Sequence, residues 1–220
     1  GISRARASLS TVDHWLKLEL LGSKRMDSNS KERGMIFNSE MVRAILSGQK
    51  TQTRRVMKPQ PVLEDAFVGG ITKPTWIYKG TATPSGWIMH NMCPFGAVGD
   101  LIWVRETFGD CGVRLVYRAD SDDGALCMVK RWTPANHMPR SASRILLEIT
   151  NVRVERLNDI SNEDAKAEGY PAELAADGGY YDPFLWLRNL WDGIYPEQSF
   201  KHNPWVWVIE FKRVQEQING

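Results

Sequence analysis

The chain has 220 residues, of which 42% are hydrophobic and 25% are charged. This length predicts one large domain, or one domain with an appendage, and this composition excludes intrinsic disorder over the whole chain. The 28 Lys and Arg residues against 26 Asp and Glu residues give a net charge of +2. That balance argues against a broad basic surface for non-specific duplex binding, so any contact with nucleic acid must come from a local basic site.

Cysteine usage and hydropathy indicate the cellular compartment. The three cysteines, Cys93, Cys111 and Cys127, contain no Cys-x-x-Cys pair, so they predict neither a disulfide framework nor a zinc ribbon. No apolar run approaches the roughly 18 residues that span a bilayer. We therefore expect a cytoplasmic protein in a reducing environment, with no membrane partner.

The first segment, residues 1–34, is rich in Ser, Lys and Arg and has helical apolar spacing only over residues 12–21. We interpret it as an N-terminal appendage, either a leader or a segment added for expression. Residues 35–220 are expected to form the folded domain.

Helix signals occur at three places in this domain. Ser39 is a candidate N-cap, and Gly48 can provide the left-handed stop of the helix that follows. Ser161 with an acidic residue three positions later predicts a helix over residues 161–168, and Asp182-Pro183 predicts the start of another.

β-Branched and aromatic residues predict strands at residues 101–107, 115–117, 145–154 and 205–211. Residues 57–94 contain many prolines and glycines and predict a long irregular excursion. Because single helices separate the strands irregularly and no glycine-rich phosphate loop is present, we predict an α+β fold with a mostly antiparallel, barrel-like sheet.

Four motifs in register resemble those of the ASCH domain family. Residues 48–55, Gly-Gln-Lys-Thr-Gln-Thr-Arg-Arg, are similar to its signature Gly-x-Lys-x-x-(Glu or Thr)-x-Arg. The other three are Gly99-Asp100 before a strand, Ala-Lys-Ala-Glu-Gly at residues 165–169, and the closing strand at residues 205–211. This resemblance covers about residues 35–214, as in larger phage and prophage members. It implies a PUA-like β-barrel with flanking helices, associated with RNA, that carries insertions near residues 57–94 and 120–140.

Within that family, amidohydrolases that deacetylate N4-acetylcytidine carry a lysine, a threonine three residues later and a glutamate on a later helix. The resemblance places these roles on Lys50, Thr53 and Glu168. It implies an amide hydrolase. We expect no cofactor, and no metal, because no complementary pair of ligands at metal spacing is present. Other members have a glutamate at the position of Thr53, and a ribonuclease activity is assigned within the family, so membership alone does not select one chemistry.

Amide hydrolysis needs a nucleophile, a base and an acid for the leaving amine, and Thr53, Lys50 and Glu168 supply one of each. A lysine accepts a proton only if burial or a neighbouring cation such as Arg55 lowers its pKa far below about 10.4. Lys50 and Thr53 lie on opposite sides of a regular strand, so they converge only in a turn or bulge. Without the resemblance, Lys50 reads as an exposed loop residue and Glu168 as an exposed residue of a last helical turn.

Cationic and planar residues occur near the predicted starts of strands. Such residues can bind the backbone phosphates and stack with the bases of single-stranded RNA. Nine tryptophans are unusual, and we interpret most as core residues and a minority as lining a cleft able to stack a base. The alternative is a polar rim around strand ends. The candidate substrate-binding residues are Arg54, Arg55, Arg105, Glu106, His137, Arg140 and Trp205.

Three functional hypotheses follow. The first is an RNA-related protein with a pocket for a cytosine-like base or modified nucleoside and an amidohydrolase activity. The second is a binding module without turnover, with RNA or a modified base as its partner. The sequence indicates no obligate protein partner. The third is a metal-assisted ribonuclease in which acidic residues such as Glu106 and Glu168 hold Mg²⁺ transiently.

Overall fold

The computed structural model describes residues 30–68, 70–82, 92–120, 128–171, 174 and 182–214. The chain divides into two units, residues 1–30 and 31–220, and the fold below is that of the second unit. The apolar segment at residues 12–21 lies outside the described residues. Strand β1, Glu32–Ile36, pairs in the main sheet, so the sheet begins before the predicted domain boundary at residue 35.

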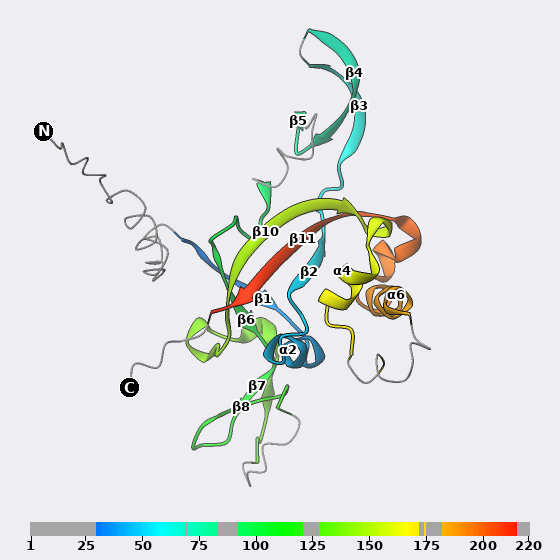
Figure 1. Cartoon of the computed structure of the whole chain (residues 1–220). Helices are drawn as coiled ribbons and strands as arrows, with labels where there is room; N and C mark the ends of the chain where they lie inside the picture. The colour runs from blue at the N-terminus through cyan, green and yellow to red at the C-terminus, as the bar shows by residue number, and fades with distance from the viewer. Residues whose placement is uncertain are drawn as a thin grey trace, which may run out of the picture. The chain divides into compact units, whose positions relative to one another are not determined.

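The main sheet has five strands in the order β1-β6-β10-β11-β2 (Figure 1). β1 runs parallel to β6, and the other three pairs are antiparallel. Together with the flanking helices, this confirms the predicted α+β class with a mostly antiparallel sheet. The other four strands are β6 Leu101–Arg105, β10 Leu146–Arg156, β11 Trp205–Arg213 and β2 Gln52–Val56.

The sheet is strongly curved. A register shift between Ile149 and Asn151 marks a bulge in β10, which bends its strand, and β10 is visibly arched in Figure 1. Among the described residues, no ladder joins the outer strands β1 and β2. Instead, Arg55 on β2 donates a hydrogen bond from Nη2 to the carbonyl oxygen of Ile36 at 3.0 Å, and its guanidinium lies 5.3 Å from the centroid of the Phe37 ring. The side chain of Arg55 therefore connects the two outer strands of the barrel-like sheet.

The central strand β11 is apolar on both faces and contributes to two cores. Trp207, Ile209 and Phe211 pack inside the curve with helix α2, Ser39–Leu46. Val206 and Val208 point the other way and pack with helix α6, Pro183–Ile194. Because side chains alternate along a strand, one run of valine, isoleucine and aromatic residues supplies both cores.

The helices begin at polar caps, as expected, with one difference. Ser161 accepts a hydrogen bond from the Asp164 amide and caps α4, Asn162–Ala167, while Asp182 caps α6. The cap of α2 is Asn38, whose Oδ1 accepts from the Met41 amide at 2.8 Å, so Ser39 is the first helical residue instead of the cap. Asn and Ser are both favoured at helix N-caps, so the sequence alone does not show which of the two residues caps α2.

The prediction of an irregular excursion at residues 57–94 is wrong for its first half. A hairpin of β3, Val62–Val68, and β4, Ile71–Tyr78, extends into β5, Thr81–Ala82. Residues 83–91 lie outside the described residues. A second small sheet joins β8 Leu115–Tyr117, β7 Phe108–Asp110 and β9 Trp132–Thr133, and short 3-10 helices occur at Ala135–His137, Arg140–Ala142, Leu157–Asp159, Pro196–Gln198 and Phe200–His202.

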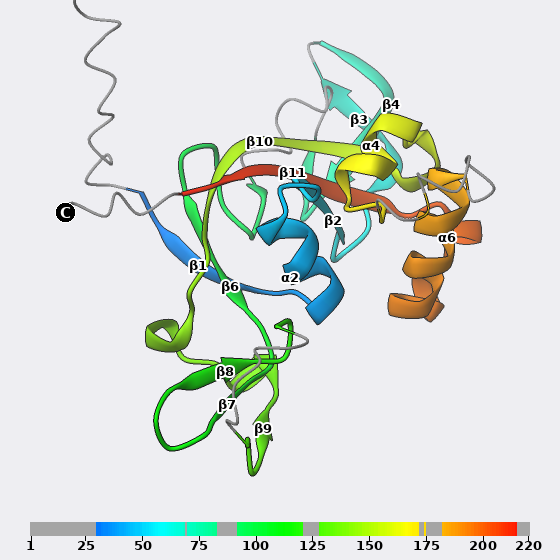
Figure 2. The same cartoon turned by 60° about the horizontal axis from the view of Figure 1, so that its bottom comes forward.

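Helices α2 and α6 stand on either side of the end of α4 (Figure 2), which places three helix segments around the start of β2. In the part of the chain that the structure describes, no helix has the length and apolar character needed to cross a membrane.

Truncation of a core side chain on β11 tests this arrangement. We expect Ile209→Ala to lower the free energy of unfolding by about 2–5 kcal/mol, because Ile209 is fully buried and its loss leaves a cavity. Leu63→Ala, at a side chain that is 56% exposed on β3, should change it by less than about 0.5 kcal/mol. Chemical denaturation of the three proteins measures both effects, and equal losses would contradict the assignment of the core.

Candidate functional site

The start of β2 is held against the end of α4. Gly48 adopts a φ of +79° after α2, and the Lys50 amide then bonds back to the Ala44 carbonyl oxygen at 2.9 Å. Lys50 and Glu168 form an antiparallel bridge, next to which the Thr51 amide donates to Ala167. Two segments that are more than one hundred residues apart in sequence therefore lie side by side at this point.

Lys50 is buried, with 2% of its surface exposed, which corrects its interpretation as an exposed loop residue. Its Nζ donates to Oε2 of Glu168 at 2.7 Å and to the carbonyl oxygen of the same residue at 2.8 Å. Burial lowers the pKa of Lys50 below its ordinary value, and the carboxylate of Glu168 opposes that shift. Lys50 is thus a buried amine with one dominant partner.

Glu168 is also buried, at 5% exposure, and forms the C-cap of α4. An anion is disfavoured at a helix C-terminus and in a dry environment. Two cations offset both costs: Lys50 binds Oε2, and Arg54 donates from Nη1 to Oε1 at 3.1 Å. Each oxygen of the carboxylate therefore has its own cationic donor, and its orientation is fixed.

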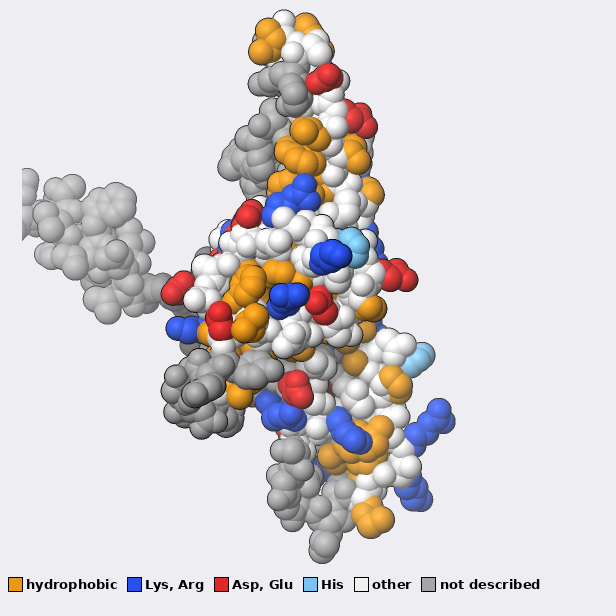
Figure 3. Space-filling model, turned by 90° about the vertical axis from the view of Figure 1, so that its right-hand side faces the viewer, with side chains coloured by type: hydrophobic (Ala, Val, Ile, Leu, Met, Phe, Trp, Pro, Cys, Tyr) orange, Lys and Arg blue, Asp and Glu red, His pale blue; other side chains and the backbone are white. Residues whose placement is uncertain are grey.

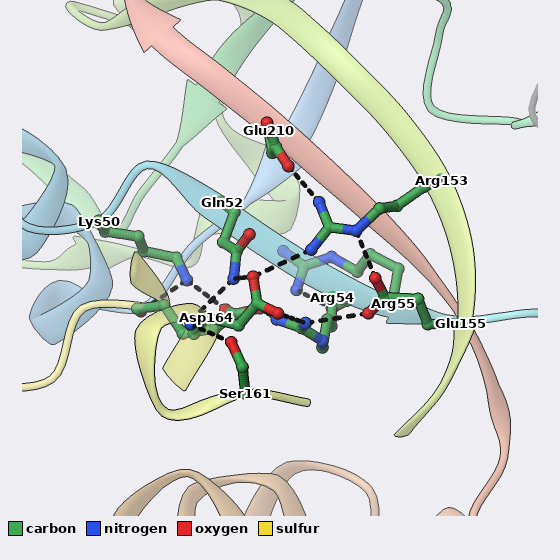
Figure 4. Close-up of polar contacts among 10 residues, drawn as sticks. Lys50, Gln52, Arg54, Arg55, Arg153, Glu155, Ser161, Asp164 and Glu210 are labelled. Atoms are coloured by element: carbon green, nitrogen blue, oxygen red, sulfur yellow. Dashed lines mark hydrogen bonds and ion pairs between the residues drawn. The ribbon is translucent and has the colours of Figure 1, made fainter. Parts of the chain in front are cut away.

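The same face of β2 carries a wider polar network (Figure 4). Gln52 donates from Nε2 to the carbonyl oxygen and Oδ1 of Asp164 at 2.8 and 3.0 Å, and Arg54 Nη2 lies 3.3 Å from Oδ2 of Asp164. Arg153 also donates to Asp164, at 3.0 Å. Burial raises the pKa of Asp164, but Gln52, Arg54 and Arg153 outweigh it and bring the pKa below its usual value.

Glu155 and Glu210 complete the outer side of this network. Arg54 Nη2 donates to Glu155 at 3.2 Å, and Arg153 is ion-paired with both Glu155 and Glu210. Lys50, Gln52 and Arg54 are alternate residues of one extended segment, and all three point at α4 or its end. The alternation of side chains along the strand accounts for this common direction.

Thr53 lies on the opposite face of β2. The pairing of β2 with β11 is continuous, with Thr53 opposite Ile209 of the inner core, so the strand has no bulge that would turn Thr53 toward Lys50. Thr53 does line a cavity of about 20 Å³ together with Arg54, Glu168 and several residues of α6. That volume suits about one water molecule, and Arg54 Nε is buried and has no hydrogen-bond partner among the described residues.

A larger pocket of about 510 Å³ opens between α2, the end of α4 and α6. Its apolar walls include Met41, Trp186 and Leu190, and Trp186 contacts Tyr170 edge to face with ring centroids 5.7 Å apart. Glu168 lines both this pocket and the small cavity, whereas Lys50 lines neither. The other lining residues are Asn38, Glu40, Arg43, Ala44, Ser47, Gln49, Gly169 and Pro171.

Four predicted binding residues have their partners elsewhere than at Glu168: Arg105 and Glu106 at the end of β6, and His137 and Arg140 in two short helices. Arg105 donates to the Ala135 carbonyl oxygen at 3.2 Å, and exposed His137 follows in the same short helix. Arg140 pairs with Glu32 at 2.8 Å.

Glu106 is buried at 2% exposure and receives two hydrogen bonds from Arg144, at 2.9 and 3.1 Å. Burial raises the pKa of Glu106, and the charge of Arg144 opposes this shift.

Trp205 and Arg55 belong to other surroundings. Trp205 packs edge to face against Trp76 of the hairpin at 5.1 Å, and the Arg156 guanidinium lies 4.5 Å from its ring centroid. Arg55 bridges β2 and β1, as described above, although it also lines the small cavity. The seven predicted binding residues therefore do not share one cleft.

Sequence reasoning missed Gln52, Asp164, Met41 and Trp186. Gln52 could have been found because it alternates with Lys50 and Arg54. Trp186 and Leu190 are four residues apart on α6 and so share a helix face, which is a recognisable signal. Met41 and Asp164 carry no signal beyond their helix positions.

Two cysteines are described. Cys111 is disulfide-bonded, a feature that the expectation of a reducing environment did not include. Cys93 is a half-buried free thiol, and burial raises its pKa. Within the described ranges, no three His, Cys, Asp or Glu side chains gather as a metal site.

No protein-family model matches the sequence, and neither does any curated protein. Among solved structures, an ASCH domain from Lactobacillus crispatus JV V101 is 13% identical, with a TM-score of 0.36 over 83% of this chain and 79% of that chain. A DUF984 protein from Enterococcus faecalis V583 is 11% identical, with a TM-score of 0.38 over 92% of this chain and 88% of that chain. Both TM-scores lie below 0.5, and these similarities assign neither a family nor an activity to the chain.

Removal of the Lys50 ammonium should destabilise the protein strongly. We expect Lys50→Met to lower the free energy of unfolding by about 3–5 kcal/mol, because a buried carboxylate loses its nearest cation. Lys212→Met is the matched control: its pair with Glu148, at 3.1 Å, is 59% exposed on the lysine side and should contribute at most about 1 kcal/mol. Equal losses of unfolding free energy for the two variants in urea denaturation would show that the Lys50 pair contributes no more than an exposed ion pair.

Gly169 should not tolerate a side chain. Its φ is +103°, and an added Cβ would lie 3.0 Å from Cβ of Ala44 and 3.3 Å from Cβ of Lys50. Gly169→Ala should therefore lower the melting temperature, whereas Gly193→Ala, in open space within α6, should raise it slightly through better helix propensity. A melting temperature that is unchanged by Gly169→Ala would rule out the close approach of α2, β2 and α4.

Proposed function

We propose that this protein recognises a cytosine-like base or modified nucleoside in the pocket beside Glu168 and hydrolyses an N4-acyl amide on that base. The observation that carries the proposal is the position of Glu168: a buried carboxylate, held by Lys50 and Arg54, lines both the 510 Å³ pocket and the water-sized cavity. The residue that carries this oriented carboxylate thus lines a space for a ligand and a space for water.

The pocket has the size and lining of a small-molecule site. Its volume of about 510 Å³ lies within the usual range for ligand pockets. Met41, Trp186 and Leu190 offer apolar and aromatic surface to a planar base. The carboxylate of Glu168 can accept a hydrogen bond from an exocyclic N–H of that base, which gives the ligand its orientation.

In the proposed hydrolysis, an O–H group adds to the acyl carbon, the carbon–nitrogen bond breaks, and the amine leaves with a proton. Glu168 accepts the proton from the attacking O–H group and delivers it to the leaving nitrogen. A water in the cavity beside Thr53 and Arg54 supplies that group. Lys50 acts as a positioning residue for Glu168, since it lines neither space.

We further propose that the chain is an ASCH-type domain. The proposal is supported by the pairing of two stretches on which the resemblance rests, residues 48–55 and 165–169, through the Lys50–Glu168 bridge and ion pair. Residues of two of the four motifs therefore lie side by side in the fold.

A binding module without turnover is the second candidate. Two observations favour it: Thr53 and Lys50 lie on opposite faces of β2, and among the described residues the Lys50 ammonium donates to Glu168 alone. The ribonuclease hypothesis gains no such support, because Glu106 pairs with Arg144 and Glu168 pairs with Lys50 and Arg54 in separate clusters.

Turnover of N4-acetylcytidine tests the proposal. We expect the wild-type protein to release acetate and cytidine, Glu168→Gln to lose turnover, and Trp186→Ala to weaken nucleoside binding about tenfold or more through lost stacking. Leu185→Ala, at an exposed residue that lines neither space, is the control and should leave both unchanged. Chromatography of products and calorimetric titration measure the two quantities.

The outcomes separate the two candidates. Binding without turnover in the wild-type protein would select the binding module. Absence of binding to both cytidine and N4-acetylcytidine would overturn the assignment of the pocket.

A further inference from the structure

A second hollow lies on the other side of the first turn of α2. It has a volume of about 460 Å³ and is lined by Ser39, Arg43, Arg118, Asp120 and Trp132. We call it the Arg118 groove. Trp132 lies on β9 of the small sheet, and Arg118 and Asp120 follow the end of β8 in that sheet.

The groove is adjacent to the 510 Å³ pocket beside Glu168, which we call the nucleoside pocket. Asn38 and Glu40 line the pocket, Ser39 lines the groove, and Arg43 lines both. Ser39 and Arg43 are one helical turn apart, about 6 Å along the axis of α2. A ligand that fills the pocket can therefore continue past Arg43 into the groove.

The groove offers exposed cationic charge. Arg118 is exposed and makes no ion pair with any described residue, and its guanidinium lies 5.1 Å from the Trp132 ring centroid. Asp120, the acidic residue of the groove, is already paired: Arg144 donates to both of its oxygens at 2.8 Å. Arg43 donates from Nη1 to the Ala119 carbonyl oxygen at 3.3 Å, and its remaining N–H groups and the Arg118 guanidinium are the donors available to a ligand.

This combination of groups suits a phosphate next to a base. Guanidinium groups bind phosphate oxygens through paired N–H donors, and an aromatic ring or a guanidinium plane stacks with a base. In the space-filling view, basic side chains lie against an apolar patch over the small sheet, toward the bottom of Figure 3. A free nucleoside would leave all of these groups unused.

We propose that the ligand of the nucleoside pocket is one nucleotide of a single-stranded RNA, with its adjoining phosphate between Arg43 and Arg118 and its neighbouring base stacked on the Arg118–Trp132 pair. This inference rests on the proposed function. The strand is unpaired, because both the base in the pocket and the base at Trp132 must expose their faces.

The test compares three probes by fluorescence competition and calorimetry: cytidine, cytidine monophosphate and a hexaribonucleotide with one cytidine among adenosines. We expect the hexamer to bind at least tenfold more tightly than cytidine. Trp132→Ala and Arg118→Ala should each remove most of that gain and leave cytidine binding unchanged. Arg118→Ala, at an exposed side chain, should fold even if Trp132→Ala does not, and it should also reduce the log-log salt slope by about 0.7.

Arg131→Ala provides the matched control, because Arg131 is an exposed arginine beside Trp132 that does not line the groove. A loss of hexamer affinity equal to that of Arg118→Ala would indicate diffuse electrostatics and overturn the inference. Equal affinities for cytidine and the hexamer, for the monophosphate and the hexamer, or for the hexamer and its duplex would also overturn it. Failure of cytidine itself to bind would instead overturn the proposed function.

Discussion

The buried ion pair between Lys50 and Glu168 is the interaction on which the site depends. A lysine and a glutamate removed from water are tolerated only when their hydrogen bonds are satisfied, and here both oxygens of the carboxylate and the lysine Nζ have short partners. The pair fixes the turn after α2, the start of β2 and the end of α4 in one arrangement. This arrangement also shapes the pocket between α2 and α6, because Glu168 and Gly169 form part of the pocket lining.

Much of the fold could be predicted because its signals are local. The cap of α4 at Ser161 and the apolar runs of β10 and β11 depend on neighbouring residues. The hairpin of β3 and β4 was missed because the side chains of β3 are largely exposed, so the alternation that marks a half-buried strand is absent there. The disulfide of Cys111 carries no spacing motif.

The site was predictable only in part, for a similar physical reason. The resemblance selected Lys50 and Glu168, which the fold brings together, but the burial of Lys50 depends on a partner 118 positions away in sequence. Thr53 was selected at a spacing of three, and the regular register of β2 turns it to the other face. Gln52, at a spacing of two, shares the face of Lys50 and Arg54, so strand geometry identifies the polar network better than the motif does.

The double-sided character of β11 has a consequence for how the unit unfolds. Both cores take side chains from this one strand, Ile209 for the core inside the curve and Val208 for the core under α6. Loss of either core would uncover one apolar face of β11 and weaken the strand on which the other core is built, so each core supports the other. The unit should behave as a single cooperative block, in which a perturbation beneath α6 and one inside the curve lower the same global stability.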